Sequence, residues 1–272
     1  MPDPTPAVHS RYAISSAVKT LQVLFAFEGT QGPTTLQELS RRAGLTTNQT
    51  FRCLKSLEDF GLVQEVRSGY ALTPTLLRLT PSVLHEPLLI DVAETALLAL
   101  RDDTGETVNL MALIGNRETL CLATYPSPQS VRLVTQVGQR ALLHAGATSK
   151  AVLAWLSESE QEDWLRMLPL LPRLTESTVL DPELLRSELA ATRERGYSIT
   201  DQDYEPGARG VGAPILGPDG RPIGGLSVGG PHERVDDRAI ERFGRLAVEA
   251  AARISRRLGY RAPAVDVDTA GA

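Results

Sequence analysis

The order of predicted elements over residues 14–80 constrains the fold of this chain more than any other feature of its sequence. Thr34 or Thr35 caps a second predicted helix, and Gly44 makes a tight turn before a third. Three helices and a hairpin in this order predict a winged helix-turn-helix, whose third helix enters the major groove of double-stranded DNA. The helices are predicted at 14–27, 36–43 and 47–60, and the hairpin strands at 62–66 and 70–72.

Polar residues on the third predicted helix suit contacts with DNA. Asn and Gln side chains pair with adenine in the major groove and Arg pairs with guanine, whereas Arg52 and Lys55 suit phosphate contacts equally well. Apolar residues recur at every third position from Phe51 to Phe60 and are expected to face the core. A solvated polar face on a small helical domain is the alternative interpretation. The candidate DNA-contacting residues are Thr34, Thr35, Thr47, Asn48, Gln49, Thr50, Arg52, Lys55 and, on the wing, Arg67.

Charge is distributed unevenly along the 272 residues, whose formal net charge is −5. Residues 1–80 carry eight basic and six acidic residues, so the predicted DNA-binding part is mildly basic and the remainder is acidic. Two cysteines exclude a disulfide framework and a four-cysteine zinc site. No apolar run approaches the roughly 18 residues that span a bilayer, and the N-terminus lacks a charged leader before an apolar stretch. We therefore expect a cytoplasmic protein without a membrane partner.

The rest of the chain alternates predicted strands and helices. Apolar residues from Leu88 to Leu100 predict a linker helix, which forms either a dimer seam or a packing face on its own domain. Strands are predicted at 107–114, 118–123, 131–134, 210–216 and 223–229, with helices at 147–156, 158–168, 182–195 and 237–258. Short hairpin-linked strands with flanking helices predict an α+β domain on an antiparallel sheet. The expected organisation is a disordered arm 1–13, the winged helix-turn-helix 14–80, the linker helix 81–102, the α+β domain 103–260 and a flexible tail 261–272.

Several motifs of the second half resemble a known family in their order and spacing. They are Glu106-Thr107-Val108-Asn109-Leu110, Val131-Arg132-Leu133, Leu143-His144-Ala145, Lys150-Ala151, Arg195-Gly196-Tyr197, Asp201-Gln202-Asp203-Tyr204-Glu205-Pro206-Gly207, Ala213-Pro214 and Leu226-Ser227-Val228-Gly229-Gly230-Pro231. This set resembles the effector domain of the IclR family of bacterial transcription regulators, and residues 36–39 and 61–63 resemble that family's winged helix. The resemblance covers residues 14–260. It implies a GAF-like ligand domain, a homodimer or dimer of dimers, and operator control by a small organic acid.

The resemblance also implies where the effector binds, between the start of the helix after the His-Ala motif and two late strands. Carried over, the effector-binding positions are Ala147, Thr148, Thr200, Asp201, Gly210, Ser227 and Gly229. A helix start offers free N–H groups and a favourable dipole to a carboxylate. Gly210 stands where some members have Cys, and Gly229 where they have Ser, which predicts a roomier pocket for an aromatic or branched acid. Close strand packing is the alternative reason for both glycines.

Enzymatic interpretations of the sequence find less support. Residues 225–229 match the G-x-S-x-G nucleophile elbow, but Ser227 lies within a predicted strand and His232 follows too closely to complete a triad. The cysteines and histidines show no metal-ligand spacing, and His144 is expected to be structural. We therefore predict no enzyme, no cofactor and no metal. The alternatives are a ligand sensor or enzyme whose winged helix contacts proteins, and a structural oligomerisation protein.

Overall fold

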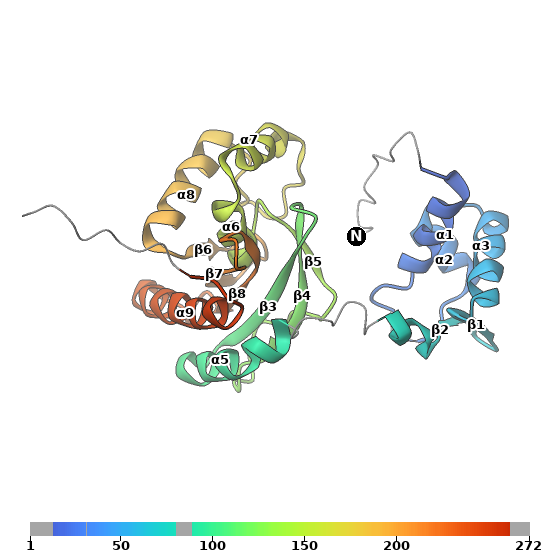
Figure 1. Ribbon diagram of the computed structural model, residues 1–272, viewed down its shortest axis with the longest axis horizontal. Helices are drawn as coiled ribbons and strands as arrows, with labels where there is room; N and C mark the ends of the chain where they lie inside the picture. The colour runs from blue at the N-terminus through green and yellow to red at the C-terminus, as the bar shows by residue number, and fades with distance from the viewer. Residues whose placement is uncertain (1–12, 31, 80–88, 262–272) are drawn as a thin grey trace, which may run out of the picture. The chain divides into compact units, whose positions relative to one another are not determined.

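The chain divides into two compact units, Met1–Pro87 and Leu88–Ala272 (Figure 1). The computed structural model describes residues 13–30, 32–79 and 89–261. The expected arm 1–13 apart from its last residue, the expected tail 261–272 apart from its first, and linker residues 81–88 lie outside the described residues. Each unit has its own apolar core.

The first unit is a winged helix-turn-helix, as predicted. Its elements are α1 (Ser15–Phe25), α2 (Leu36–Ala43), α3 (Thr47–Asp59), β1 (Val63–Val66), β2 (Gly69–Leu72) and the 3₁₀ helix η1 (Pro74–Leu79). The Thr35 side chain accepts a hydrogen bond from the Glu38 N–H and caps α2, and Gly44 ends this helix in the left-handed region at φ 65°. Strands β1 and β2 pair antiparallel and form the wing. The sequence did not predict η1.

The buried side of α3 differs from the prediction. Thr50 lies in the core beside Leu54 and Leu57, whereas Phe51 is 40% exposed and Phe60 is 79% exposed. Positions spaced by three residues drift by about 60° per step around a helix of 3.6 residues per turn, so the run from Phe51 to Phe60 cannot stay on one face. Spacings of four and three residues keep Thr50, Leu54 and Leu57 on the core side. Thr50 therefore points away from the exposed side on which the sequence placed it.

The second unit is an α+β domain built on a six-stranded sheet with strand order β5-β4-β3-β8-β7-β6. Every neighbouring pair of strands in it is antiparallel, as predicted. The elements are α5 (Leu89–Thr104), β3 (Thr107–Ile114), β4 (Glu118–Tyr125), β5 (Arg140–Leu142), α6 (Ala147–Trp155), α7 (Glu158–Met167), η2 (Leu168–Leu170), α8 (Pro182–Arg195), β6 (Ser198–Asp201), β7 (Ala208–Leu216), β8 (Pro222–Pro231) and α9 (Asp237–Arg257).

Both edges of this sheet differ from the prediction. Residues 131–134 form no strand, and Val131 and Val134 are exposed. The Leu133 carbonyl accepts a hydrogen bond from the Thr107 hydroxyl at 3.0 Å in place of a strand partner. The edge strands are β5 and β6, neither of which the sequence predicted. Alternating apolar residues do not distinguish a strand from a loop in which one apolar side chain turns inward.

Helices cover both faces of the sheet (Figure 1). Helices α5 and α9 pack on one face, where they share a core with Val108, Val211 and Leu226 of the central strands. Val92 and Leu97 of α5 are buried in this core, so the apolar stripe of the linker helix packs on its own domain. Helix α6 lies on the opposite face, with α8 and α7 packed outside it.

Two glycines allow α6 to approach the sheet closely. A Cβ atom on Gly212 of β7 would lie 2.4 Å from the backbone carbonyl carbon of Ala147, and one on Gly225 of β8 would lie 2.9 Å from Cγ2 of Thr148. A larger residue at either position must therefore displace α6. The Ser198 hydroxyl of β6 also donates to the Ala147 carbonyl. These contacts fix the start of α6 against the sheet.

We expect Gly212→Ala to lower the free energy of unfolding of the second unit by about 1–3 kcal/mol, because the new methyl group overpacks a contact between two backbones. Urea unfolding followed by tryptophan fluorescence measures this, since both tryptophans of the chain, Trp155 and Trp164, lie in the second unit. Gly229→Ala is the matched control, because its nearest neighbour at 3.2 Å is a methyl group of the flexible Leu133 side chain. Equal midpoints for Gly212→Ala and the wild type would contradict the close contact.

Candidate functional site

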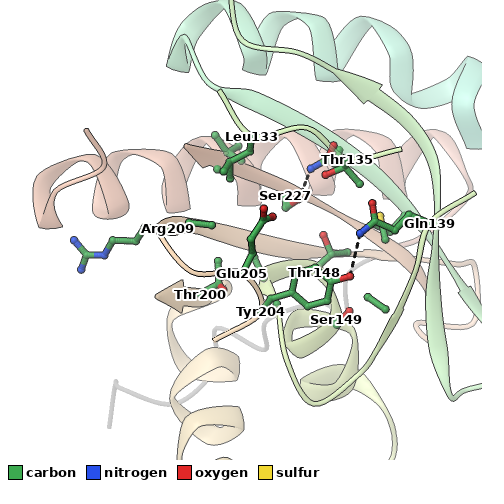
Figure 2. Close-up of a pocket in the computed structure, with 18 of the residues that line it drawn as sticks. Leu133, Thr135, Gln139, Thr148, Ser149, Thr200, Tyr204, Glu205, Arg209 and Ser227 are labelled. Carbon is green, nitrogen blue, oxygen red and sulfur yellow. Dashed lines mark hydrogen bonds between the residues drawn. The ribbon is translucent and has the colours of Figure 1, made fainter. Parts of the chain in front are cut away.

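A cavity in the second unit, called the α6 cavity below, collects most of the predicted effector-binding residues (Figure 2). Its volume is about 110 Å³. It lies between the start of α6, the strands β3 and β8, the loop that contains residues 133–139, and residues 200–209. Met111 and Leu133 contribute apolar side chains to its lining, beside the polar groups described next.

The start of α6 presents hydrogen-bond donors to the α6 cavity. Gly146 precedes the helix at φ 85°, and no side chain caps the first turn. The N–H groups of Ala147 and Thr148 are among the first four of the helix, which have no acceptor within it. Thr148 lines the cavity and is 5% exposed, and its hydroxyl has no hydrogen-bond partner in the described part of the chain. This end of the cavity therefore favours an anion.

Strands β3 and β8 contribute a second polar pair. Asn109 and Ser227 are opposite each other in the β3–β8 register, and the Asn109 side-chain amide donates to the Ser227 hydroxyl at 3.5 Å. The Oδ1 atom of Asn109 is buried and has no hydrogen-bond partner among the described residues. Ser227 lies within β8 rather than at a turn from a strand into a helix, so the G-x-S-x-G match forms no nucleophile elbow.

The loop between β6 and β7 brings Tyr204 and Glu205 to the α6 cavity (Figure 2). The Gln139 side-chain amide donates to the Tyr204 hydroxyl at 3.2 Å. Asp203, the preceding residue, is buried and forms a salt bridge with Lys150 of α6. Helix α6 therefore holds this loop in place as well as offering donors at its own start.

Lys150 is a buried cation, only 3% exposed, between two carboxylates. Its ammonium group pairs with Asp203 and with Glu188 of α8. Burial alone would lower the pKa of Lys150, but the two carboxylates outweigh burial and raise it. The lysine therefore stays charged and ties α6, α8 and the loop after β6 together. Removing one partner from such a group would leave a buried charge uncompensated.

Five of the seven predicted effector-binding residues line the α6 cavity: Ala147, Thr148, Thr200, Ser227 and Gly229. Asp201 does not line it, because its exposed carboxylate pairs with the guanidinium of Arg209 at 3.3 Å. Gly210 does not line it either, and a Cβ atom there would lie 2.3 Å from the carbonyl oxygen of Val228. Close strand packing therefore accounts for Gly210, whereas Gly229 borders the cavity.

Sequence reasoning did not select several residues that line the α6 cavity. Asn109, Leu133, Tyr204 and Glu205 all belong to motifs that carried the family resemblance, so a signal was present. What it lacked was the direction in which each side chain points. Leu133 and Gln139 lie outside the regular elements, where residue spacing predicts no facing direction.

The predicted DNA-contacting residues are divided between the surface and the core of the first unit. The exposed ones are Thr35, Thr47, Asn48, Arg52 and, at the tip of the wing, Arg67. Thr34 and Thr50 are buried, and their hydroxyls donate to the carbonyls of Gly32 at 3.3 Å and Thr46 at 3.1 Å. The Gln49 side chain accepts from the Thr46 N–H and completes a capping box at the start of α3.

Lys55 is held within the first unit. Its ammonium group lies 2.7 Å from Oε2 of Glu58 and 3.0 Å from Oε2 of Glu65, and 5.5 Å from the centre of the Phe51 ring. Hydrogen bonds to the two carboxylates raise the pKa of Lys55. Arg52 is exposed on the same helix, so it is better placed than Lys55 to meet a phosphate or a base.

The described residues hold no group of three or more His, Cys, Asp or Glu side chains arranged for a metal ion. Within that part of the chain, no helix combines the length and the apolar character needed to cross a membrane. Cys53 and Cys121 are buried and free. Burial raises the pKa of the Cys121 thiol to about 11, and a thiol that stays protonated is a poor nucleophile.

Two family models match the chain. The model described as bacterial transcriptional regulator IclR C-terminal matches residues 82–256. The model described as IclR helix-turn-helix domain matches residues 16–67. The second match covers the three helices and the first wing strand of the first unit, and the first match covers nearly all of the domain that contains the α6 cavity.

Known proteins with the same two parts are similar over nearly the whole chain. The transcriptional repressor IclR of Escherichia coli K12 is 29% identical over 249 residues, or 90% of each protein. The crystal structure of the Thermotoga maritima IclR matches with a TM-score of 0.68 and 28% identity, covering 90% of this chain and 99% of that one. An IclR homologue from Microbacterium hydrocarbonoxydans, complexed with 4-hydroxybenzoate, matches with a TM-score of 0.75 and 26% identity, covering 90% and 99%.

A buried histidine beside the start of α6 makes the stability of the second unit depend on pH. His144 is 1% exposed, and its Nε2 atom lies 3.1 Å from the carbonyl oxygen of Pro172. Burial lowers the pKa of His144 in the folded protein. Histidines of the unfolded chain have pKa values of about 6.5. As the pH falls, His144 is therefore protonated in the unfolded chain before it is protonated in the folded chain. The stability that neutral His144 contributes above about pH 6.5 is therefore lost progressively as the pH falls toward the lowered pKa of His144 in the folded protein.

We expect the free energy of unfolding of the second unit to fall between pH 7.5 and pH 5, and to fall less steeply in His144→Gln. Urea unfolding at several pH values, followed by tryptophan fluorescence, measures the slope. His232→Gln is the comparison variant, because His232 is a half-buried histidine of the same unit whose Nε2 atom lies 3.5 Å from Oδ1 of Asp201. If the slope is unchanged in His144→Gln and altered in His232→Gln, His144 is not the residue that causes the pH dependence.

Proposed function

Because the chain belongs to the IclR family of bacterial transcriptional regulators, we propose that a small organic acid bound in the α6 cavity controls its binding to operator DNA. The chain is a DNA-binding transcriptional regulator with an N-terminal helix-turn-helix domain and a C-terminal α+β domain. One observation carries the effector part of the proposal: the uncapped start of α6 and the unpartnered Thr148 hydroxyl border the same cavity.

The exposed end of α3 and the tip of the wing make the contacts with DNA. Thr47, Asn48 and Arg52 meet the major groove, and Arg67 meets the backbone or the minor groove. The exposure of these side chains supports this assignment. The buried Thr34 and Thr50 instead stabilise the winged helix-turn-helix.

The effector binds with its carboxylate against the N–H groups at the start of α6. The Thr148 hydroxyl donates a further hydrogen bond to it, and Thr200 and Ser227 lie within the same cavity. The complex of the Microbacterium hydrocarbonoxydans homologue with 4-hydroxybenzoate, an aromatic acid, supports this class of ligand. A glycine at position 229 leaves room that a serine would occupy, which favours an acid larger than two carbons.

The effector acts by shifting populations between conformations that bind DNA with different affinity. A coupling of about 1–3 kcal/mol would change operator affinity by roughly 5- to 150-fold. The protein works in the cytoplasm as a homodimer or a dimer of dimers, because paired winged helices read two half-sites of one operator. It does so without a cofactor.

A ligand sensor whose winged helix contacts proteins is the competing function. The match of residues 16–67 to a helix-turn-helix family of DNA-binding regulators disfavours it. The two functions are separated by fluorescence anisotropy with a duplex from upstream of the gene and a scrambled duplex of equal length. Tighter binding to the native duplex supports the regulator, and equal binding to both duplexes supports the sensor.

We expect Arg52→Ala to weaken binding of the native duplex by about 10- to 100-fold, because one base or phosphate contact is lost. If the contact is to a phosphate, the slope of log affinity against log salt should also fall by about one. Arg253→Ala, which removes an exposed arginine from α9, is the control. Wild-type affinity in Arg52→Ala would contradict the assignment of α3 to the major groove.

We expect Thr148→Val to weaken binding of small carboxylic acids by about 10- to 100-fold, because valine keeps the shape of threonine and removes the donor to the charged group. Isothermal titration calorimetry with 4-hydroxybenzoate and a panel of aliphatic acids measures the change. Ser187→Ala, which removes an exposed hydroxyl from α8, is the control. Unchanged affinity in Thr148→Val would place the carboxylate elsewhere.

A further inference from the structure

The α6 cavity has two chemically different ends. Donors gather at the start of α6, where the Thr148 hydroxyl is buried and unpartnered. Acceptors gather on the other side, where the Asn109 Oδ1 atom is buried and unpartnered and the Glu205 carboxylate borders the cavity. A simple carboxylic acid satisfies the first end and leaves the second without a donor.

The two residues before Glu205 hold its loop at the α6 cavity. Asp203, two residues earlier, is fixed by the salt bridge to Lys150, and the Tyr204 hydroxyl accepts from the amide of Gln139. Figure 2 shows the Glu205 carboxylate directed toward Ser227, the hydrogen-bond partner of Asn109. The carboxylate therefore faces whatever occupies the α6 cavity.

The cation beside Glu205 does not neutralise it. Arg209 borders the α6 cavity, but its guanidinium pairs with Asp201 at 3.3 Å and with Asp237 at 2.6 Å. It also donates to the carbonyl of Val235 at 3.0 Å, and Figure 2 shows it directed away from the cavity. Within the described residues no salt bridge to Glu205 is formed. The negative charge of Glu205 is therefore available to a ligand.

We infer that the effector is a monocarboxylic acid that carries a hydroxyl or amino group at its other end, and that Glu205 selects it. This inference rests on the proposed function, because it takes the start of α6 as the carboxylate site. A hydroxyl or amino group donates to Glu205 and to Asn109 Oδ1 and satisfies both. A second carboxylate would meet the charge of Glu205 and is rejected by repulsion. Glu205 is thus a specificity-determining residue at the mouth of the cavity.

Matched acids test the inference on the full-length protein. One series is benzoate, its three hydroxy derivatives and the three benzenedicarboxylates. A second series is butyrate, 4-hydroxybutyrate and succinate. Isothermal titration calorimetry should show that, in at least one series, a hydroxy acid binds about 3- to 10-fold more tightly than its parent acid; the gain is modest because Glu205 is exposed to solvent. The dicarboxylates should bind more weakly than the parent acid.

Glu205→Gln separates charge from shape. We expect this variant to lose most of the preference for the hydroxy acid and to bind dicarboxylates more tightly than the wild type does. Affinity for the parent acid should rise less than affinity for the dicarboxylates, because only the second carboxylate of a dicarboxylate lies beside Glu205. Glu241→Gln removes the same charge from an exposed position on α9 and should leave all three affinities unchanged.

The outcomes separate the role of Glu205 from the acid site at the start of α6. If hydroxy acids show no advantage, or if Glu205→Gln leaves the order of the three acid classes unchanged while the acids still bind, the role of Glu205 is wrong and the acid site survives. If no acid of either series binds the folded wild type, the proposed acid site is wrong. The same holds if every acid binds Thr148→Val as tightly as it binds the wild type, and in both cases the inference about Glu205 is also wrong.

Discussion

The second unit depends on the contact between the start of α6 and two glycines of the sheet. Gly212 and Gly225 bring the helix backbone closer to β7 and β8 than any side chain would permit. Because the helix start is pressed against the sheet, its free N–H groups open beside Asn109 and Ser227 rather than into bulk solvent. The position of the α6 cavity therefore depends on the two strand glycines, and its polar residues determine only its chemistry.

Helix α6 also determines the opposite wall of the cavity. Lys150 lies one turn after the helix start, and its buried ammonium group holds Asp203 and, through the chain, Tyr204 and Glu205. A buried ion pair contributes little net stability, since desolvation offsets most of the attraction. Its value here is positional, because the same helix fixes donors at one end of the cavity and acceptors at the other. The spacing between these two ends is what a bound acid would have to match.

The sequence predicted those parts of the fold that local chemistry determines. A threonine cap at position 34 or 35, the turn at Gly44 and the order of helices and wing strands in the first unit needed no knowledge of distant residues. The sequence predicted Phe51 in the core and Thr50 on the surface of α3, and the structure shows the reverse. The error arises because a three-residue spacing resembles helical periodicity over a short run. For Gly210 the sequence left a cavity position and close strand packing open. Only the strand register shows that this glycine lies against the backbone of Val228 and does not border the cavity.

Strand β3 links the α6 cavity to the helix that follows the junction between the units. Its side chains alternate, so Asn109 borders the cavity while Val108 and Leu110 pack in the core shared with α5. An acid bound as we propose would contact a strand whose other face is close-packed, and a close-packed core moves between discrete arrangements rather than deforming smoothly. Helix α5 begins at Leu89, directly after the junction. Under the proposed function, β3 is therefore the strand through which a bound acid would act on α5, because α5 packs against its other face.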